Sequence, residues 1–102
     1  MQTTGRKKLE IIIEATVLRR VEQFLDEAGV RGWTVLPSIE GHGSHGDWSS
    51  GDFTPGQERR LIVAVATSDV AQRALDRLAS FFADYPGIVF LSDVEVLRPE
   101  RF

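Results

Sequence analysis

The spacing of apolar residues predicts a strand, a helix and a second strand in the first third of the chain. Residues 7–14 alternate imperfectly and carry a β-branched run, which indicates a strand. From Leu18 apolar residues recur every three or four positions, which predicts a helix. The helix should end at Ala28, because Gly29 suits the left-handed closing position, and Thr16 is the expected N-cap. Residues 32–39 predict the second strand.

The last half of the chain repeats this order. Residues 59–67 are a nearly continuous apolar run, which predicts a third strand that needs cover on both faces. A helical stripe starts at residue 70, with Ser68 or Asp69 as its cap, and the Pro86-Gly87 pair stops it. Residues 88–97 alternate again and predict a fourth strand.

Two such halves predict an α+β, ferredoxin-like βαββαβ fold, with a four-stranded antiparallel sheet and both helices on one face. The other face of the sheet would then be bare. Ile12, Ile62, Ala64 and Ala66, or the residues that alternate with them, would lie on it in exposed rows. We therefore expect copies of the chain to associate and cover this face.

Residues 37–57, between the second and third strands, have no helical or strand period. They hold five of the nine glycines and both histidines. A loop of this length in a compact domain is usually functional or disordered. Glycines at 41 and 43 allow the backbone to turn several N–H groups towards an anion, although they would also suit a solvated, flexible loop.

Composition narrows the function classes. The chain has 102 residues, enough for a single domain over residues 1–102, and its net charge of −3 argues against a general nucleic-acid binder. It has no cysteine, which excludes disulfides and thiolate metal sites. No apolar run has the length of a signal or membrane segment, so we expect a cytoplasmic protein.

Several short motifs, in order, resemble the PII signalling superfamily. Residues 27–35, Glu-Ala-Gly-Val-Arg-Gly-Trp-Thr-Val, look like its passage from first helix to second strand, and Gly41-His42-Gly43-Ser44 falls at the root of its long T-loop, here residues 37–57. Residues 81–89, Phe-Phe-Ala-Asp-Tyr-Pro-Gly-Ile-Val, and residues 95–97 are similar to the bicarbonate-transporter and carboxysome-associated branch. The resemblance covers nearly the whole chain.

The resemblance implies a homotrimer that binds adenine nucleotides in clefts between subunits and changes its T-loop on binding. The nucleotide-binding residues that it implies are Thr34, Gly41, Gly43, Ser44, His45, Gly87, Ile88, Val89, Arg98 and Arg101. The two arginines would contact phosphate, since a guanidinium offers paired donors to phosphate oxygens. Trp48 and Phe53, aromatic residues in a polar loop, would contact a partner protein.

Departures from the family pattern refine the expected ligand. His45 stands where a glutamine usually joins magnesium and 2-oxoglutarate, and the glycine-rich loop with its lysine is replaced by residues 84–87. ADP or AMP is therefore favoured over ATP, with bicarbonate as a second ligand. The implied role is the regulation of inorganic-carbon uptake or fixation, through a bicarbonate transporter or a carboxysome-related protein.

Two alternatives remain at this point. His42 and His45, with Asp47 nearby, could hold zinc, copper or nickel in a metal-binding trimer of the same fold. A weak nucleotide hydrolase is the other alternative. The sequence contains no paired carboxylates on a clear scaffold and no Gly-x-x-x-x-Gly-Lys run, so we expect a protein without catalytic activity.

Overall fold

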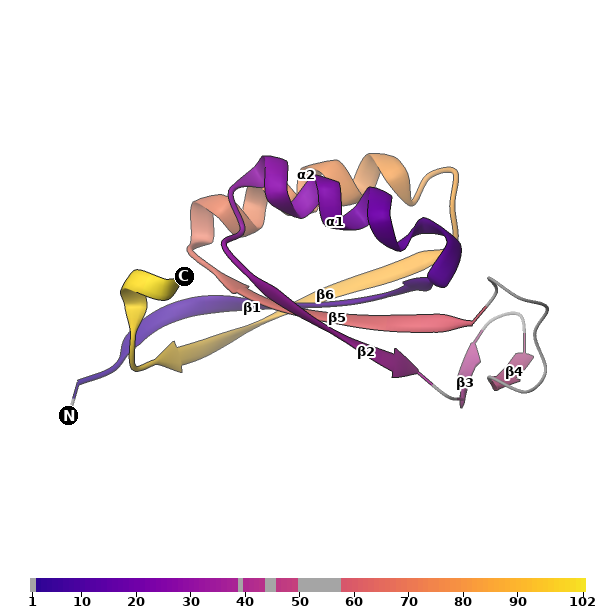
Figure 1. Cartoon of the computed structure of the whole chain (residues 1–102), viewed down its shortest axis with the longest axis horizontal. Helices are drawn as coiled ribbons and strands as arrows, with labels where there is room; N and C mark the ends of the chain where they lie inside the picture. Colours follow the sequence, from indigo (N-terminus) through magenta and orange to yellow (C-terminus); the bar gives the residue numbers. More distant parts are fainter. Residues whose placement is uncertain (1, 39, 44–45, 50–57) are drawn as a thin grey trace.

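The computed structural model is a four-stranded antiparallel sheet with two helices packed on one face (Figure 1). It describes residues 2–38, 40–43, 46–49 and 58–102. The elements in chain order are β1 (Thr4–Glu14), the 3₁₀ turn η1 (Ala15–Val17), α1 (Leu18–Ala28), β2 (Trp33–Ser38), β3 (Glu40–Gly43), β4 (Gly46–Ser49), β5 (Arg59–Ala66), α2 (Ser68–Phe81), β6 (Gly87–Val96) and the 3₁₀ turn η2 (Pro99–Arg101). The main sheet has the order β2-β5-β1-β6, which confirms the predicted ferredoxin-like class.

The core lies between the sheet and the helices. Leu9, Ile11 and Ile13 of β1 are fully buried and stand next to alternate residues of β5. The core cluster consists of Leu9, Ile11, Ile13, Val17, Val21, Leu25, Ala28, Val30, Ile62, Ala64, Ala66, Ala71, Ala74, Leu78 and Phe81. Of the alternatives predicted for the exposed rows, Ile12 of β1 lies on the open face, whereas in β5 it is the residues that alternate with Ile62, Ala64 and Ala66 that do, because the period of two places these three in the core.

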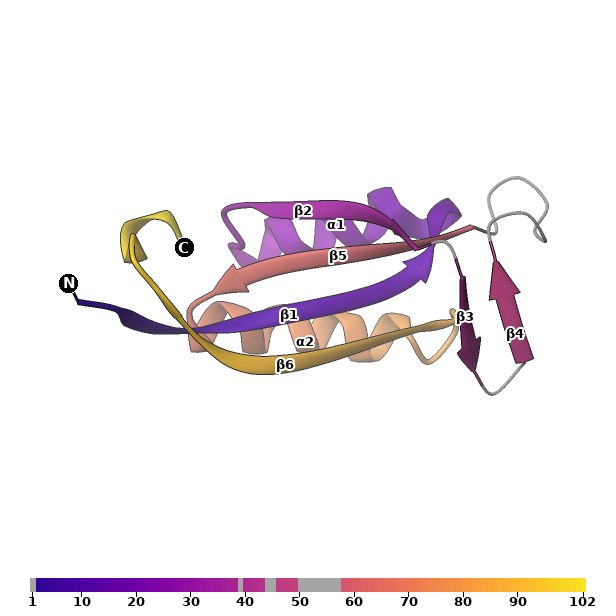
Figure 2. The ribbon, with the colours of Figure 1, turned by 90° about the horizontal axis from the view of Figure 1, so that it is seen from below.

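The face of the sheet opposite the helices carries an apolar row across all four strands. Leu36 of β2 pairs with Leu61 of β5, Leu61 with Ile12 of β1, and Ile12 with Ile88 of β6. Leu36 is 41% exposed and Ile88 56% exposed. Figure 2 shows this face, which no described element covers. We call these four residues the apolar row.

The ends of the helices depend on one glycine and one threonine. Gly29 ends α1 with φ of 98°, as predicted, and the Val30 N–H then donates to the Leu25 carbonyl at 2.9 Å. Thr67, rather than Ser68 or Asp69, caps α2: its Oγ1 accepts from the Val70 N–H at 3.4 Å. Thr16 is not a cap, because it lies inside η1, and no side chain caps α1.

The caps allow a matched stability test. We expect Thr67→Ala to lower the free energy of unfolding by about 1 kcal/mol, because it removes an acceptor from the first turn of α2. Thr16→Ala is the control and should change it by only a few tenths of a kcal/mol, since Thr16 is exposed and caps no helix. Urea denaturation measures both, and an equal loss in the two variants would contradict the assignment.

The region predicted to lack strand structure contains a short hairpin. β2 extends to Ser38, and β3 pairs with β4 in the register Glu40–Ser49, Gly41–Trp48, His42–Asp47 and Gly43–Gly46. The hairpin lies beyond one end of the main sheet (Figure 1). No helix in the described ranges is long and apolar enough to cross a membrane.

Candidate functional site

The predicted nucleotide-binding residues fall into two groups at opposite ends of the sheet. Gly41 and Gly43 of β3 and residues 87–89 at the start of β6 lie at the hairpin end, and we call them the loop half. Arg98 and Arg101 lie at the other end, at the C-terminal turn, and form the arginine half (Figure 1). β6 separates the halves with ten residues, or about 30 Å of extended strand. One mononucleotide therefore cannot contact both halves of a single chain.

Thr34 lies between the two halves. It is an exposed residue of β2 and pairs with Val63 on the open face of the sheet. On the same row stand Glu10 of β1 and Phe90 of β6, which is 46% exposed. The open face thus offers apolar and hydroxyl groups beside the apolar row.

The loop half contains a glycine required by packing. A Cβ added at Gly87 would lie 2.5 Å from Cε1 of Phe82, too close for any side chain without movement of the ring. Val89 packs against the core, whereas Ile88 points to the open face. The presence of glycine at 87 is thus explained by close packing, whether or not its backbone also contacts a ligand.

A stacked aromatic cluster fixes the turn that precedes β6. Tyr85 stacks on Phe81 with ring centroids 4.5 Å apart and planes at 10°. The Arg20 guanidinium lies 5.0 Å from each of these two ring centroids and donates to the Tyr85 hydroxyl at 3.1 Å. The turn is therefore tied to α1, which fixes where the backbone of residues 87–89 begins.

The arginine half presents two cations to solvent. Arg98 and Arg101 are exposed, and the Arg101 N–H donates to the Arg98 carbonyl at 3.0 Å, which closes η2. Neither guanidinium has a hydrogen bond or ion pair to another residue in the described part of the chain. Both side chains are thus available to an anionic ligand.

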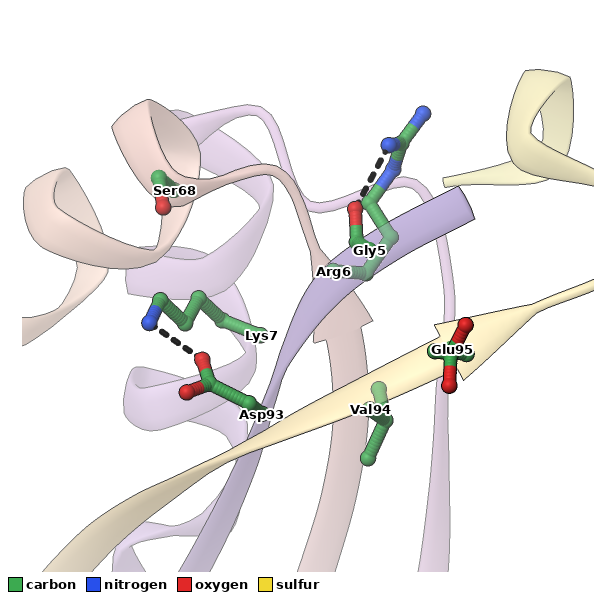
Figure 3. A pocket seen from close by; sticks show the side chains of 7 residues that line it. All are labelled: Gly5, Arg6, Lys7, Ser68, Asp93, Val94 and Glu95. Atoms are coloured by element: carbon green, nitrogen blue, oxygen red, sulfur yellow. Dashed lines mark hydrogen bonds and ion pairs between the residues drawn. The ribbon is translucent and has the colours of Figure 1, made fainter. Parts of the chain in front are cut away.

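A pocket that the sequence did not suggest lies at the arginine end. It has a volume of about 470 Å³ and is lined by Gly5, Arg6, Lys7, Ser68, Asp93, Val94 and Glu95 (Figure 3). Lys7 and Asp93 form an ion pair within it. Arg6 points away from this pair, and its Nη2 donates to the Pro99 carbonyl at 3.1 Å. The basic run at residues 6–8 was the only signal in the sequence, and it suits the solvated start of a strand equally well.

The family model for Nitrogen regulatory protein P-II matches residues 6–101, which is nearly the whole chain. The chain belongs to the PII family. A solved structure of CPII, a nitrogen regulatory PII-like protein from Thiomonas intermedia K12, bound to ADP, AMP and bicarbonate, is similar with 31% identity and a TM-score of 0.91. The match covers 99% of this chain and 96% of that one.

Two further structures support the same fold. CPII bound to ADP and bicarbonate is 32% identical, with a TM-score of 0.88 and coverage of 99% and 97%. GlnK of B. subtilis is 16% identical, with a TM-score of 0.64 and coverage of 97% and 100%, and this likeness bears on the fold alone. The PII fold is thus shared well beyond the range of clear sequence similarity.

The β3–β4 hairpin lies within residues 37–57, the segment predicted to be the T-loop. His42 stands opposite Asp47 in that hairpin, whereas Ser44, His45 and Phe53 lie outside the described residues. Trp48 belongs to β4, where it pairs with Gly41. Within the described ranges no three potential metal ligands come together, and His45, a ligand in the metal-binding alternative, lies outside them.

Proposed function

We propose that this PII-family protein is a non-enzymatic regulator that binds ADP or AMP, in preference to ATP, together with bicarbonate. The observation that carries the proposal is the similarity to CPII, whose solved structure holds ADP, AMP and bicarbonate and aligns over 96–99% of both chains. CPII is a nitrogen regulatory PII-like protein, and the family shown for this chain is that of nitrogen regulatory protein P-II. Binding alters the T-loop, and the T-loop regulates inorganic-carbon uptake or fixation.

The nucleotide site lies between subunits of a homotrimer. This part of the proposal is supported by the separation of the loop half and the arginine half within one chain, by about 30 Å of β6. If a neighbouring copy supplies the arginine half, both halves can reach one ligand. Arg98 and Arg101 then contact phosphate, Thr34 lies near the base, and the loop half supplies backbone N–H groups.

The open face of the sheet supports the proposed trimer independently of the ligand. The apolar row places four aliphatic side chains side by side, and on the next row Val63 and Phe90 flank Glu10, whose carboxylate pairs with Lys8. An apolar face of this kind is unusual on a monomeric protein. Packing three such faces together would remove the rows from water.

Calorimetric titration with ADP, AMP, ATP and bicarbonate tests the proposed ligands. We expect ADP and AMP to bind more tightly than ATP, and bicarbonate to bind with nucleotide present. In Arg98→Ala/Arg101→Ala, ADP should bind at least about tenfold more weakly, because charge-assisted hydrogen bonds to phosphate are lost. Arg19→Ala, an exposed arginine of α1, is the control and should bind normally. Absence of binding by all three nucleotides would overturn the proposal.

The T-loop supplies the proposed contact with a partner. Trp48 and Phe53 are the aromatic residues of residues 37–57, and aromatic side chains are common anchors in protein interfaces. We infer a cytoplasmic protein that is recruited to a bicarbonate transporter or a carboxysome-related protein. Retention of a purified bicarbonate transporter on the immobilised protein, compared with and without ADP, tests this contact. Replacement of both aromatic residues by serine should abolish retention; unchanged retention would exclude them as anchors.

A further inference from the structure

The C-terminal turn, residues 98–102, is held to the body of the protein by two arginines from distant parts of the chain. Arg6 of β1 donates from Nη2 to the Pro99 carbonyl at 3.1 Å. Arg31, between α1 and β2, donates from Nη1 to the Glu100 carbonyl. Both acceptors are backbone oxygens, so these bonds fix the path of the turn itself rather than the position of a side chain.

The turn has few other means of keeping its place. Its internal bonds are those of a single 3₁₀ turn, from the Arg101 N–H to the Arg98 carbonyl and from the Phe102 N–H to the Pro99 carbonyl. One turn of helix is too short to be stable by itself. None of residues 98–102 is fully buried. Besides the partial burial of Pro99 and Phe102, the turn is therefore held by the hydrogen bonds from Arg6 and Arg31.

Arg6 is suited to this role because it is partly withdrawn from water. Its Nη1 donates to the Gly5 carbonyl at 2.9 Å, and its Nε is buried without an acceptor in the described part of the chain. No ion pair with a carboxylate neutralises it among those residues. Since arginine keeps its proton, Arg6 also adds an uncompensated positive charge beside the turn. Figure 3 shows its guanidinium on the side away from the Lys7–Asp93 pair.

We propose that Arg6 and Arg31 are positioning residues for nucleotide binding. They hold the C-terminal turn by its carbonyl oxygens and so orient Arg98 and Arg101 towards the phosphates of the ligand. This inference rests on the proposed function, since it requires that the two C-terminal arginines bind an adenine nucleotide. The physical advantage is preorganisation: a turn already in place loses less conformational freedom when the ligand arrives.

A double-mutant cycle tests whether Arg6 acts through the C-terminal arginines. We expect Arg6→Ala to weaken ADP binding about tenfold in the otherwise unchanged protein, because ordering a free segment opposes binding. In the Arg98→Ala/Arg101→Ala background, Arg6→Ala should cause no additional loss, since no phosphate-binding side chain is left to orient. Calorimetry measures all four proteins. Arg31→Ala should repeat the pattern.

Amide hydrogen exchange gives a reading that does not involve the ligand. In Arg6→Ala without nucleotide, the amides of residues 101 and 102 should exchange faster, while those of the core strands keep their rates. Arg19→Ala is the control, because Arg19 is an exposed arginine in the first turn of α1 and has no hydrogen bond to the C-terminal turn within the described residues. It should leave both ADP affinity and the exchange of residues 101–102 unchanged.

The outcomes separate this inference from the proposed function. Unchanged exchange at residues 101–102 in Arg6→Ala, unchanged ADP affinity, or an equal loss of affinity in both backgrounds would overturn the positioning role. Failure of the unsubstituted protein to bind ADP would overturn the proposed function instead. A tenfold loss confined to the background that keeps Arg98 and Arg101 supports the inference.

Discussion

Leu61→Glu is expected to convert the proposed trimer to a monomer and to abolish the proposed ADP binding with it. Leu61 pairs with both Leu36 and Ile12 at the middle of the apolar row, so a carboxylate there would be buried without a partner if three sheets packed together. Burying an unpaired charge costs several kcal/mol, and this cost opposes the association of the three sheets. Sedimentation equilibrium measures the mass, and calorimetry with ADP measures the site.

Ala79→Glu is the control for this substitution. Ala79 is exposed on α2, which covers the other face of the sheet, so the same new charge should leave the mass and the ADP affinity unchanged. A folded Leu61→Glu protein that keeps the mass of a trimer would show that the open face is not the subunit interface. Far-ultraviolet circular dichroism checks that the variant is folded, as we expect, since residue 61 lies outside the buried core cluster.

Gly87→Val should lower the free energy of unfolding by up to about 3 kcal/mol, because a side chain at this position would overlap the Phe82 ring at 2.5 Å. Combining it with Phe82→Ala should lower stability by less than the sum of the two single losses, since the smaller residue makes room for the new side chain although its own removal from the core has a cost. Thermal or urea unfolding measures both. A Gly87→Val protein of normal stability that binds ADP weakly would instead assign this glycine to ligand contact alone.

Helix and strand periods predicted the main sheet and both helices because those elements bury one face each. The helix over residues 18–28 has the predicted bounds, and the strand predicted at 88–97 forms one residue earlier, as β6. β1 begins at Thr4 rather than at residue 7, because its first residues pair with β6 without adding to the core. An alternating pattern of apolar residues reveals a strand only where one of its faces is buried. The first residues of β1 are exposed or only partly buried, so they show no such pattern.

The failures occurred where hydrogen bonds, rather than burial, decide the structure. Thr16 and Thr67 each precede the apolar stripe of a helix, but only Thr67 is an N-cap. Thr16 lies inside the 3₁₀ turn before α1, and this difference cannot be seen in the stripe. The β3–β4 hairpin is rich in glycine and joined by backbone pairing, so its side chains carry no alternation that would reveal it. The sequence of this segment is therefore equally consistent with a short hairpin and with a loop that has no strands.

The arrangement of the predicted site residues in space could not be read from the sequence. A motif such as residues 98–101 can indicate phosphate binding without revealing that it lies at the far end of β6 from the T-loop root. Contacts such as Arg6 to the Pro99 carbonyl join residues 93 positions apart, and no local pattern encodes them. These distances in space become visible only once the sheet order is known.

The separation of the loop half from the arginine half also has a genetic consequence. In the proposed ring of three, every chain serves two different sites, one through each end of its sheet. A subunit that lacks Arg98 and Arg101 leaves the site that it shares with one neighbour without an arginine half. Its intact loop half still completes the site that it shares with the other neighbour. Two alleles with defects in opposite halves should therefore complement each other when they are expressed together, although each is inactive alone.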